Sequence, residues 1–201
     1  MESYTVTIGR QFGSMGRPIG KRAAELLGIN YFDRDIVEEV SKRMGMPLSV
    51  ISKEEEEARH RFGIYGKMLF PMGGGTTELQ NRIFFVQECV LQDFADRGPC
   101  ILVGRCGDYL MRERKNLLRI FIFAPLEDRI QNCVTYFHMT PEKARRMCID
   151  VDKARVAYHR RYAGYPPMDP AKTDIMLNSA AFGVEGSARV LADIIERRFI
   201  L

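Results

Sequence analysis

A glycine-rich turn near the start of the chain has the composition of a phosphate-binding loop. Gly9, Gly13 and Gly16 lie between a β-branched run at residues 4–8 and an apolar helical pattern that begins at Ile19. Glycines allow backbone N–H groups to converge on an oxyanion, and the start of the next helix adds its own N–H groups and the positive end of its dipole. The predicted phosphate-binding residues are Arg10, Gly13, Ser14, Met15, Gly16, Arg17 and Pro18.

The spacing of this turn departs from the common pattern GxxxxGK[ST]. Six residues instead of four separate Gly9 from Gly16. Arg17 stands in place of the lysine, and Pro18 stands in place of the Ser/Thr that binds Mg²⁺. We expect Arg17 to replace the lysine, with Arg10 as the alternative. If Arg17 has no function, it is simply an exposed arginine at the start of a helix. The pattern alone also permits a second interpretation, a glycine-rich turn that binds no ligand.

Arginines are concentrated in the last third of the chain. The members of this group are Arg145, Arg146, Arg155, Arg160 and Arg161. Planar guanidinium groups suit bidentate capture of phosphate. Asp152 precedes Arg155 by three residues, so the two share one helix face, and an exposed ion pair of little energetic value is the alternative interpretation.

The overall charge argues for a small anionic ligand. The chain has 30 Lys+Arg against 26 Asp+Glu, a formal net charge of +4, which does not suggest a nucleic-acid binder. The five cysteines form no CxxC pair, so neither a disulfide framework nor a zinc site is predicted. The absence of a basic-then-apolar N-terminal segment and of a long apolar run predicts a reducing, cytoplasmic location without membrane association. His60, His138 and His159 show no partner pattern, and we expect none of them to be catalytic.

Strand-like and helix-like segments alternate along the chain. The predicted strands are 4–8, 29–32, 100–103, 117–123 and 174–178, and the predicted helices are 19–27, 33–44, 48–61, 78–97, 126–137, 141–162 and 184–199, with a loop at 63–77. Such alternation predicts a parallel sheet covered on both faces, whose ligands bind beyond the carboxyl ends of the strands. We therefore expect Gly9, Gly28 and Gly104 to lie at one cleft.

Several motifs, in order, resemble the cytidylate kinase-like family of P-loop kinases. The matching stretches are 9–19 (GRQFGSMGRPI), 28–37 (GINYFDRDIV), 103–109 (VGRCGDY), 152–162 (DKARVAYHRRY) and 173–178 (TDIMLN). The resemblance implies a three-layer α/β/α P-loop NTPase fold with a parallel five-stranded sheet, in a single domain over residues 1–201. It also implies a helical acceptor-binding region at about 33–97 and an arginine-rich lid at about 138–165. The implied reaction is Mg²⁺-dependent transfer of the γ-phosphoryl group of ATP to a nucleoside monophosphate, with CMP or dCMP as the expected acceptor.

The resemblance also implies roles for individual residues. Catalytic roles fall to Arg17, Arg155 and Arg161; acceptor contacts fall to Asp33, Arg34, Arg105, Asp108 and Asp152; and Ser14 is the predicted metal ligand. Asp33 as a simple helix N-cap and Arg105 as a surface ion-pair partner stay open as alternatives. Bacterial cytidylate kinases have Gly-Arg-Asp where this chain has Cys106, with Asp108 two residues further on, which puts the base specificity in doubt.

Two other functions stay open at this point. Pro18 and Cys106 also suit a protein that binds a nucleotide without transferring its phosphate. A P-loop kinase for a different small molecule is equally compatible with the fold, because a fold does not determine the acceptor.

Overall fold

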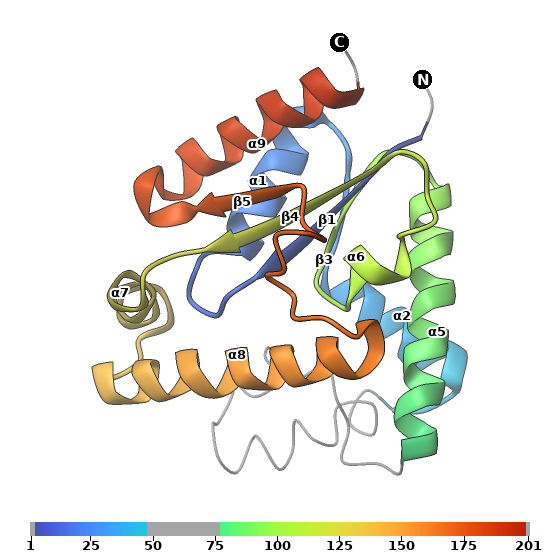
Figure 1. Cartoon of the computed structure of the whole chain (residues 1–201), viewed down its shortest axis with the longest axis horizontal. Helices are drawn as coiled ribbons and strands as arrows, with labels where there is room; N and C mark the ends of the chain where they lie inside the picture. The colour runs from blue at the N-terminus through green and yellow to red at the C-terminus, as the bar shows by residue number, and fades with distance from the viewer. Residues whose placement is uncertain (1–2, 48–76, 200–201) are drawn as a thin grey trace.

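The computed structural model describes residues 3–47 and 77–199 (Figure 1). Five parallel strands form one sheet in the order β2-β3-β1-β4-β5. The strands are β1 (Thr5–Arg10), β2 (Asn30–Phe32), β3 (Cys100–Val103), β4 (Leu117–Phe123) and β5 (Ile175–Asn178). The predicted parallel five-stranded sheet is therefore confirmed, with β1 in the centre between β3 and β4.

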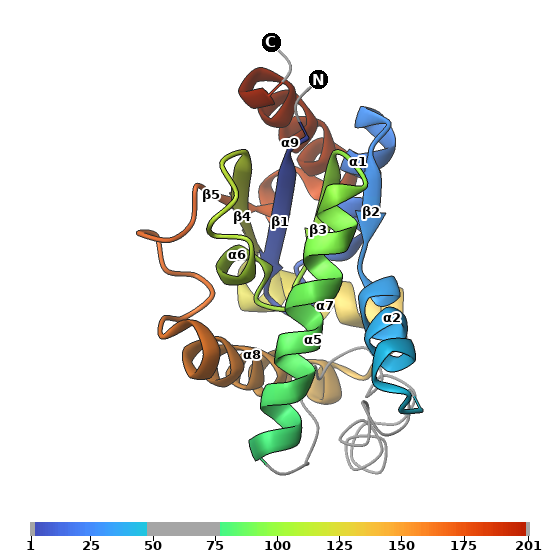
Figure 2. The same ribbon diagram turned by 90° about the vertical axis from the view of Figure 1, so that its right-hand side faces the viewer.

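Two helices cover one face of the sheet. They are α1 (Gly16–Leu27) and α9 (Gly183–Phe199), which lie next to each other in both ribbon views (Figures 1 and 2). Their apolar residues pack on Val6, Ile8 and Ile101. Successive side chains of a strand point to opposite faces, so every second residue of β1 and β3 is buried here.

The other face is covered by α2 (Arg34–Met44), α5 (Thr77–Asp96) and the short α6 (Gly107–Leu110). Cys100 and Leu102, which alternate with Ile101, belong to this second buried cluster. Helices on both faces make the three-layer α/β/α arrangement that the sequence predicted.

A third cluster lies beyond the carboxyl ends of the strands. It joins α7 (Leu126–Phe137) and α8 (Pro141–Ala163) to Phe12 of the glycine-rich turn. Thr140 caps α8 by accepting a hydrogen bond from the Lys143 N–H, and Pro141 occupies the first helical position. The predicted lid region thus forms one continuous helix that runs along the carboxyl edge of the sheet (Figure 1).

The prediction for Gly28 is wrong. Gly28 is the C-cap of α1 in the left-handed conformation and directly precedes β2. The N–H of Asn30, the first residue of β2, bonds to the carbonyl of Pro99 just before β3, so Gly28 lies at the amino edge of the sheet. The predicted helix at 48–61 and most of the predicted loop at 63–77 fall outside the described residues.

Two short elements were not predicted. These are α6, directly after the Gly104 turn, and a 3₁₀ turn at Ser179–Ala181. Asp174, just before β5, accepts hydrogen bonds from the Arg119 backbone and side chain at 2.8–3.1 Å. None of the described helices combines the length and the apolar character needed to cross a lipid bilayer.

Candidate active site

The turn between β1 and α1 is held from behind by its own side chains. Ser14 is fully buried, and its hydroxyl lies 2.9 Å from the Gln11 carbonyl and 3.1 Å from the Ile122 carbonyl of β4. A Cβ added to Gly13 would lie 2.7 Å from the Arg129 carbonyl oxygen, so only glycine fits at this position. Such a short separation requires something to shift, and the obstacle is backbone. The turn therefore keeps its shape because its side chains point into the protein.

The same arrangement leaves backbone donors on the other side of the turn. Within the described part of the chain, the N–H groups of Gly13, Ser14 and Met15 donate no hydrogen bond. Met15 has the left-handed conformation (φ 59°) and is the N-cap of α1. Unpaired N–H groups next to a helix N-terminus form an anion-binding cradle, so this turn fits the phosphates of a nucleotide.

A buried ion pair supports the cradle from the side of α7 and α8. Arg129 donates hydrogen bonds to the Phe12 carbonyl at 3.1 Å and to the Asp152 carboxylate at 2.7 Å. Asp152 also accepts the Phe12 N–H at 2.8 Å. Burial raises the pKa of Asp152, an effect opposed by the Phe12 hydrogen bond and by the neighbouring arginines. In the structure Asp152 therefore braces the turn, and its predicted contact with an acceptor stays a prediction.

A second turn follows β3 at the same edge of the sheet. Gly104, Arg105 and Cys106 all have positive φ angles, of 76°, 60° and 56°. Left-handed backbone costs a residue other than glycine about 1–2 kcal/mol. Backbone strain of this kind occurs most often where a side chain is held for function. Here it accompanies the placement of Arg105 in the wall of the cleft described below.

Four arginines from four segments meet between the two turns. The members are Arg10 at the end of β1, Arg17 in the first turn of α1, Arg105 after β3, and Arg155 on α8. Arg155 donates a hydrogen bond to the Arg10 carbonyl at 2.8 Å. The Arg10 guanidinium lies so close to Gly104 that a Cβ at that position would overlap it.

Two carboxylates contact three of these arginines. Asp33 accepts a hydrogen bond from Arg17 Nη2 at 3.2 Å. Its other oxygen lies 2.8 Å from Arg17 Nε, a contact between charges whose N–H is not directed at the oxygen, since Nε makes no hydrogen bond. Asp33 also lies 3.9 Å from Arg10, and Asp152 lies 3.8 Å from Arg155. Arg10, Arg17 and Arg155 therefore share two carboxylates, of which Asp152 also pairs with Arg129.

The pKa values of Arg155 and Arg10 lie below the ordinary value for arginine. Burial lowers the pKa of Arg155 to about 10, and Arg17 and Arg105 contribute to the lowering against the opposing effect of Asp152. Burial also lowers the pKa of Arg10, together with the charges of Arg155 and Arg17. Positive charges that depress one another's pKa values bind an anion favourably, because the anion relieves the repulsion.

A cleft with an open volume of about 640 Å³ lies beside the arginines. Its wall is formed by Thr7, Ile8, Gly9, Arg10, Gly104, Arg105, Cys106, Gly107, Asp108, Arg155, Tyr158, His159 and Pro167. The wall combines three arginines with a group that we call the histidine end, formed by Cys106, Asp108, Tyr158 and His159.

The histidine end of the cleft contains a hydrogen-bonded group around Asp108. His159 Nε2 lies 2.9 and 3.0 Å from the two carboxylate oxygens, and the Tyr165 hydroxyl donates to the same carboxylate at 3.1 Å. Cys106 Sγ lies within 4.8 Å of the His159 and Asp108 ligand atoms, a spacing that a metal ion could bridge. The hydrogen bonds account for the positions of His159 and Asp108, and we assign no metal to this group.

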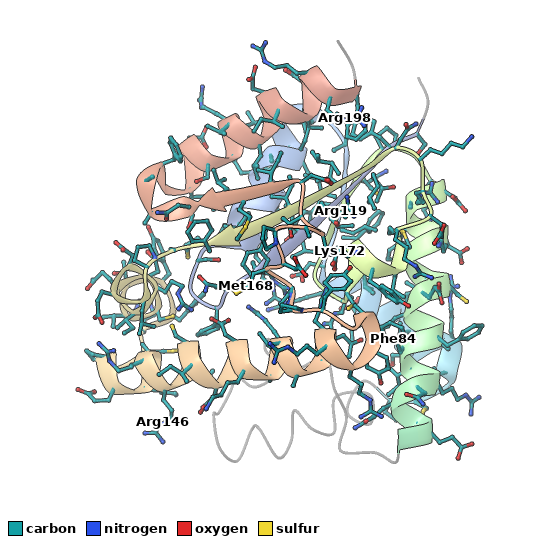
Figure 3. All side chains as sticks on the ribbon, in the orientation of Figure 1. Phe84, Arg119, Arg146, Met168, Lys172 and Arg198 are labelled. Atoms are coloured by element: carbon teal, nitrogen blue, oxygen red, sulfur yellow. The ribbon has the colours of Figure 1, made fainter. Side chains whose placement is uncertain are left out.

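The structure separates the predicted arginine group. Arg155 reaches the cleft, whereas Arg145, Arg146, Arg160 and Arg161 are exposed. Arg145 pairs with Glu127 at 2.6 Å, and Arg146 points away from the sheet (Figure 3). Arg161 donates to Gln80 of α5 at 2.6 Å. Arg161 does not line the cleft, and its predicted catalytic role stays a prediction.

Three other predictions change in the structure. Arg34 is exposed on the first turn of α2 and does not line the cleft. Asp33 makes no side-chain N-cap bond, so its carboxylate serves Arg17 instead. The Ser14 hydroxyl is occupied by two carbonyls, which argues against its predicted role as metal ligand.

The turn between β1 and α1 has no side chain suited to bind Mg²⁺ directly. Position 18 is proline, the Ser14 hydroxyl faces β4, and the Gln11 side chain accepts the Ala124 N–H. Within the described residues, residues 10–18 therefore offer Mg²⁺ no free side-chain oxygen. Since Mg²⁺ keeps water and phosphate ligands readily, we derive no step through the ion.

Sequence reasoning missed Arg129 and gave no role to His159. Arg129 has no motif around it, and its contact with Phe12 joins residues 117 positions apart. His159 had a usable signal, because Asp152, Arg155 and His159 follow the spacing i, i+3, i+7 and so lie on one helix face.

Comparisons with known proteins agree with this geometry. Residues 5–181 match the model of the cytidylate kinase-like family. The cytidylate kinase of Methanopyrus kandleri is 23% identical over 203 residues, covering 96% of this chain and 94% of that protein.

Two solved structures show the same fold. An uncharacterized protein from Eubacterium ventriosum superposes with a TM-score of 0.72 at 19% identity, covering 96% of this chain and 98% of the other. Shikimate kinase from Acinetobacter baumannii, in complex with shikimate, has a TM-score of 0.53 at 14% identity and coverages of 99% and 96%.

Proposed function

The chain belongs to the cytidylate kinase-like family, and on that premise we propose that it transfers the γ-phosphoryl group of ATP to a nucleoside monophosphate, with CMP or dCMP as the acceptor. The observation that carries the proposal is the group of Arg10, Arg17, Arg105 and Arg155 beside a turn with unpaired N–H groups. Two anionic groups brought together need such a site, because their mutual repulsion must be neutralised before they can react.

The donor would bind at the first turn. The N–H groups of Gly13, Ser14 and Met15 face the phosphates of ATP, and Arg17 at the start of α1 reaches the terminal phosphate. Asp33 keeps the Arg17 guanidinium in place through the contact at 2.8 Å. The turn supplies fixed dipoles, which need no rearrangement as charge moves during the reaction.

The acceptor would place its phosphate between the two turns. Arg105 and Arg155 bind that phosphate, and Arg10 lies below it. A phosphate oxygen of the acceptor is already anionic, so the transfer needs no general base. Catalysis then consists of alignment and neutralisation of charge on the transferring phosphoryl group, as in other kinases.

The histidine end of the cleft would receive the nucleoside. Asp108 presents a hydrogen-bond acceptor at this end, which suits the exocyclic amino group of cytosine better than the carbonyl of uracil. This assignment gives Asp108 a recognition role in spite of Cys106 standing where bacterial cytidylate kinases have aspartate.

A coupled assay of ADP release tests the proposal. Purified protein with ATP and Mg²⁺ is offered CMP, dCMP, UMP, AMP and GMP in turn, with shikimate and gluconate as non-nucleotide acceptors. We expect turnover with CMP or dCMP at least tenfold above that with UMP, since an unmatched buried acceptor costs about one hydrogen bond. Turnover with shikimate or gluconate alone would redirect the proposal to another small-molecule acceptor.

One observation favours a second function, which is nucleotide binding without phosphoryl transfer. Pro18 and the occupied Ser14 hydroxyl leave the turn without its own Mg²⁺ ligand. Calorimetric titration with ATP, with and without Mg²⁺, separates the two functions. Binding that does not depend on Mg²⁺, together with no turnover of any monophosphate, would support the second.

A further inference from the structure

His159 makes hydrogen bonds that require both ring nitrogens to carry a proton. Nδ1 lies 2.7 Å from the carbonyl oxygen of Tyr165, and a carbonyl can only accept. Nε2 lies 2.9 and 3.0 Å from the carboxylate oxygens of Asp108, which also accept when ionised. An imidazolium satisfies both contacts, whereas a neutral ring can satisfy only one.

The surroundings favour the charged ring. His159 is 4% exposed, and burial by itself lowers its pKa, but the hydrogen bond and the charge of Asp108 outweigh burial and raise the pKa above its ordinary value. The other titratable groups near the pair are the Tyr165 hydroxyl, Cys106 and Tyr158, whose pKa values are all raised by burial as the first cause. These three are therefore neutral near pH 7.

Positive groups nearby do not replace the imidazolium. Arg119 of β4 pairs with Asp174 at 2.9 Å, and Lys172 lies 5.9 Å from the Tyr165 ring. Arg119 lies on β4, and Lys172 lies on the segment that precedes β5 (Figure 3). Within the described residues, His159 is the cation that contacts Asp108 directly.

The position of the pair connects two parts of the cleft. His159 lies one helical turn after Arg155 on α8, while Asp108 lies on α6, two residues after the left-handed turn. The C-terminal part of α8 is also tied to α5, by the hydrogen bond of Tyr158 to Gln87 at 2.9 Å and by the stacking of Tyr162 on Phe84. The pair therefore joins the helix that carries Arg155 to the wall that carries Arg105.

We propose that His159 is a positioning residue: as an imidazolium it fixes the Asp108 carboxylate in the cleft and thereby makes acceptor binding dependent on pH. This inference rests on the proposed function and adds a residue and a regulation to it. When the ring loses its Nε2 proton, a lone pair faces the carboxylate, and Asp108 keeps only the hydrogen bond from the Tyr165 hydroxyl. The affinity for the acceptor is then present below the pKa of His159 and is lost as the pH rises through that raised pKa.

Steady-state kinetics of three variants test the proposal. In His159→Leu we expect KM for CMP to rise about tenfold at pH 6.5, with kcat changed by less than about twofold. In His159→Gln the amide nitrogen replaces Nε2 as a donor without titrating, so KM should equal that of the wild type at low pH and should not follow the titration of His159. His138→Asn, an exposed position at the end of α7, is the matched control and should behave as wild type.

The acceptor phosphate itself titrates near pH 6, so the pH profile is read as the ratio of wild type to His159→Gln. The ionisation of the phosphate cancels in this ratio, because it is the same in both assays. We expect the ratio of the KM of wild type to the KM of His159→Gln to rise with increasing pH. A flat ratio, or equal KM values in wild type and His159→Leu, would overturn the inference while leaving the proposed function intact. A wild type that neither binds nor phosphorylates any monophosphate would overturn both.

A second measurement needs no activity. The chain has three histidines, so the ring signals of labelled protein can be assigned from His159→Gln and His138→Asn. We expect His159 to titrate above the ordinary histidine range and to return towards it in Asp108→Asn. An unchanged His159 titration in that variant would contradict the ion pair.

Discussion

Two turns that follow neighbouring strands offer a ligand different groups: the turn after β1 offers backbone N–H groups, and the turn after β3 offers a side chain. In the turn after β1, Phe12 and Ser14 are buried, and the N–H groups of Gly13, Ser14 and Met15 have no acceptor among the described residues. In the turn after β3, the backbone adopts three left-handed conformations, and Arg105 lines the cleft. Backbone N–H groups can bind the anionic oxygens of any phosphate, whereas side chains can differ between proteins that bind different substrates. We therefore expect the first turn to account for the donor and the second for the acceptor.

Arg155 connects the two turns, so its replacement should have the largest effect. Arg155→Met removes the hydrogen bond to the Arg10 carbonyl and one guanidinium of the group. We expect kcat/KM to fall about 10³-fold, as for other arginines that stabilise a transferring phosphoryl group. Arg145→Met on the same helix, exposed and paired with Glu127, is the control and should lie within about twofold of wild type. If kcat/KM of a folded Arg155→Met protein fell by less than tenfold, Arg155 would not be the residue that connects the two turns.

Gly104→Ala tests the second turn by displacing Arg10. Gly28→Ala is the matched control, because both glycines have positive φ angles, of 76° and 64°. Both changes should cost about 1 kcal/mol of stability. A Cβ at Gly104 overlaps the Arg10 guanidinium, whereas a Cβ at Gly28 meets nothing within 4 Å. Only Gly104→Ala should therefore lose activity, by about 10²-fold; equal activities would show that Arg10 is not needed where it lies.

Arg129→Met tests whether the first turn depends on support from behind. It leaves the Phe12 and Ala124 carbonyls without a donor and Asp152 without its nearest cation. We expect urea denaturation to show a loss of about 2–4 kcal/mol in the free energy of unfolding. The Arg145→Met protein should change by less than about 0.5 kcal/mol. Full stability in Arg129→Met would mean that the turn keeps its shape without this support.

Ser14→Ala should have the smallest effect and separates a structural role from metal binding. The loss of a buried hydroxyl bonded to carbonyls should cost about 1 kcal/mol. Ser187, also fully buried but without a hydrogen-bond partner, is the control, and Ser187→Ala should be neutral. The dependence of activity on Mg²⁺ concentration should not change in Ser14→Ala; a large increase in the Mg²⁺ requirement would restore the role first predicted for Ser14.

The order and type of the main elements could be predicted because they depend on local pattern. Predicted strands at 100–103 and 117–123 and the predicted helix at 126–137 have the observed bounds. Buried strands of a parallel sheet are continuous apolar runs, and Thr140-Pro141 is a strong local start signal. Gly28 misled the prediction because a helix C-cap and a strand end both favour glycine.

The sequence alone determined the sheet, the glycine-rich turn and the presence of an arginine-rich helix after Thr140. Only the tertiary structure decided which arginine serves the cleft. Arg155 shares a face with Asp152 and His159, and that face meets the turns because Phe12 and Asp108 lie opposite it. The partners are separated by 140 and 51 residues, so no local pattern could identify them. For the same reason Ser14, predicted as a metal ligand, became a buried support once β4 lay beside it.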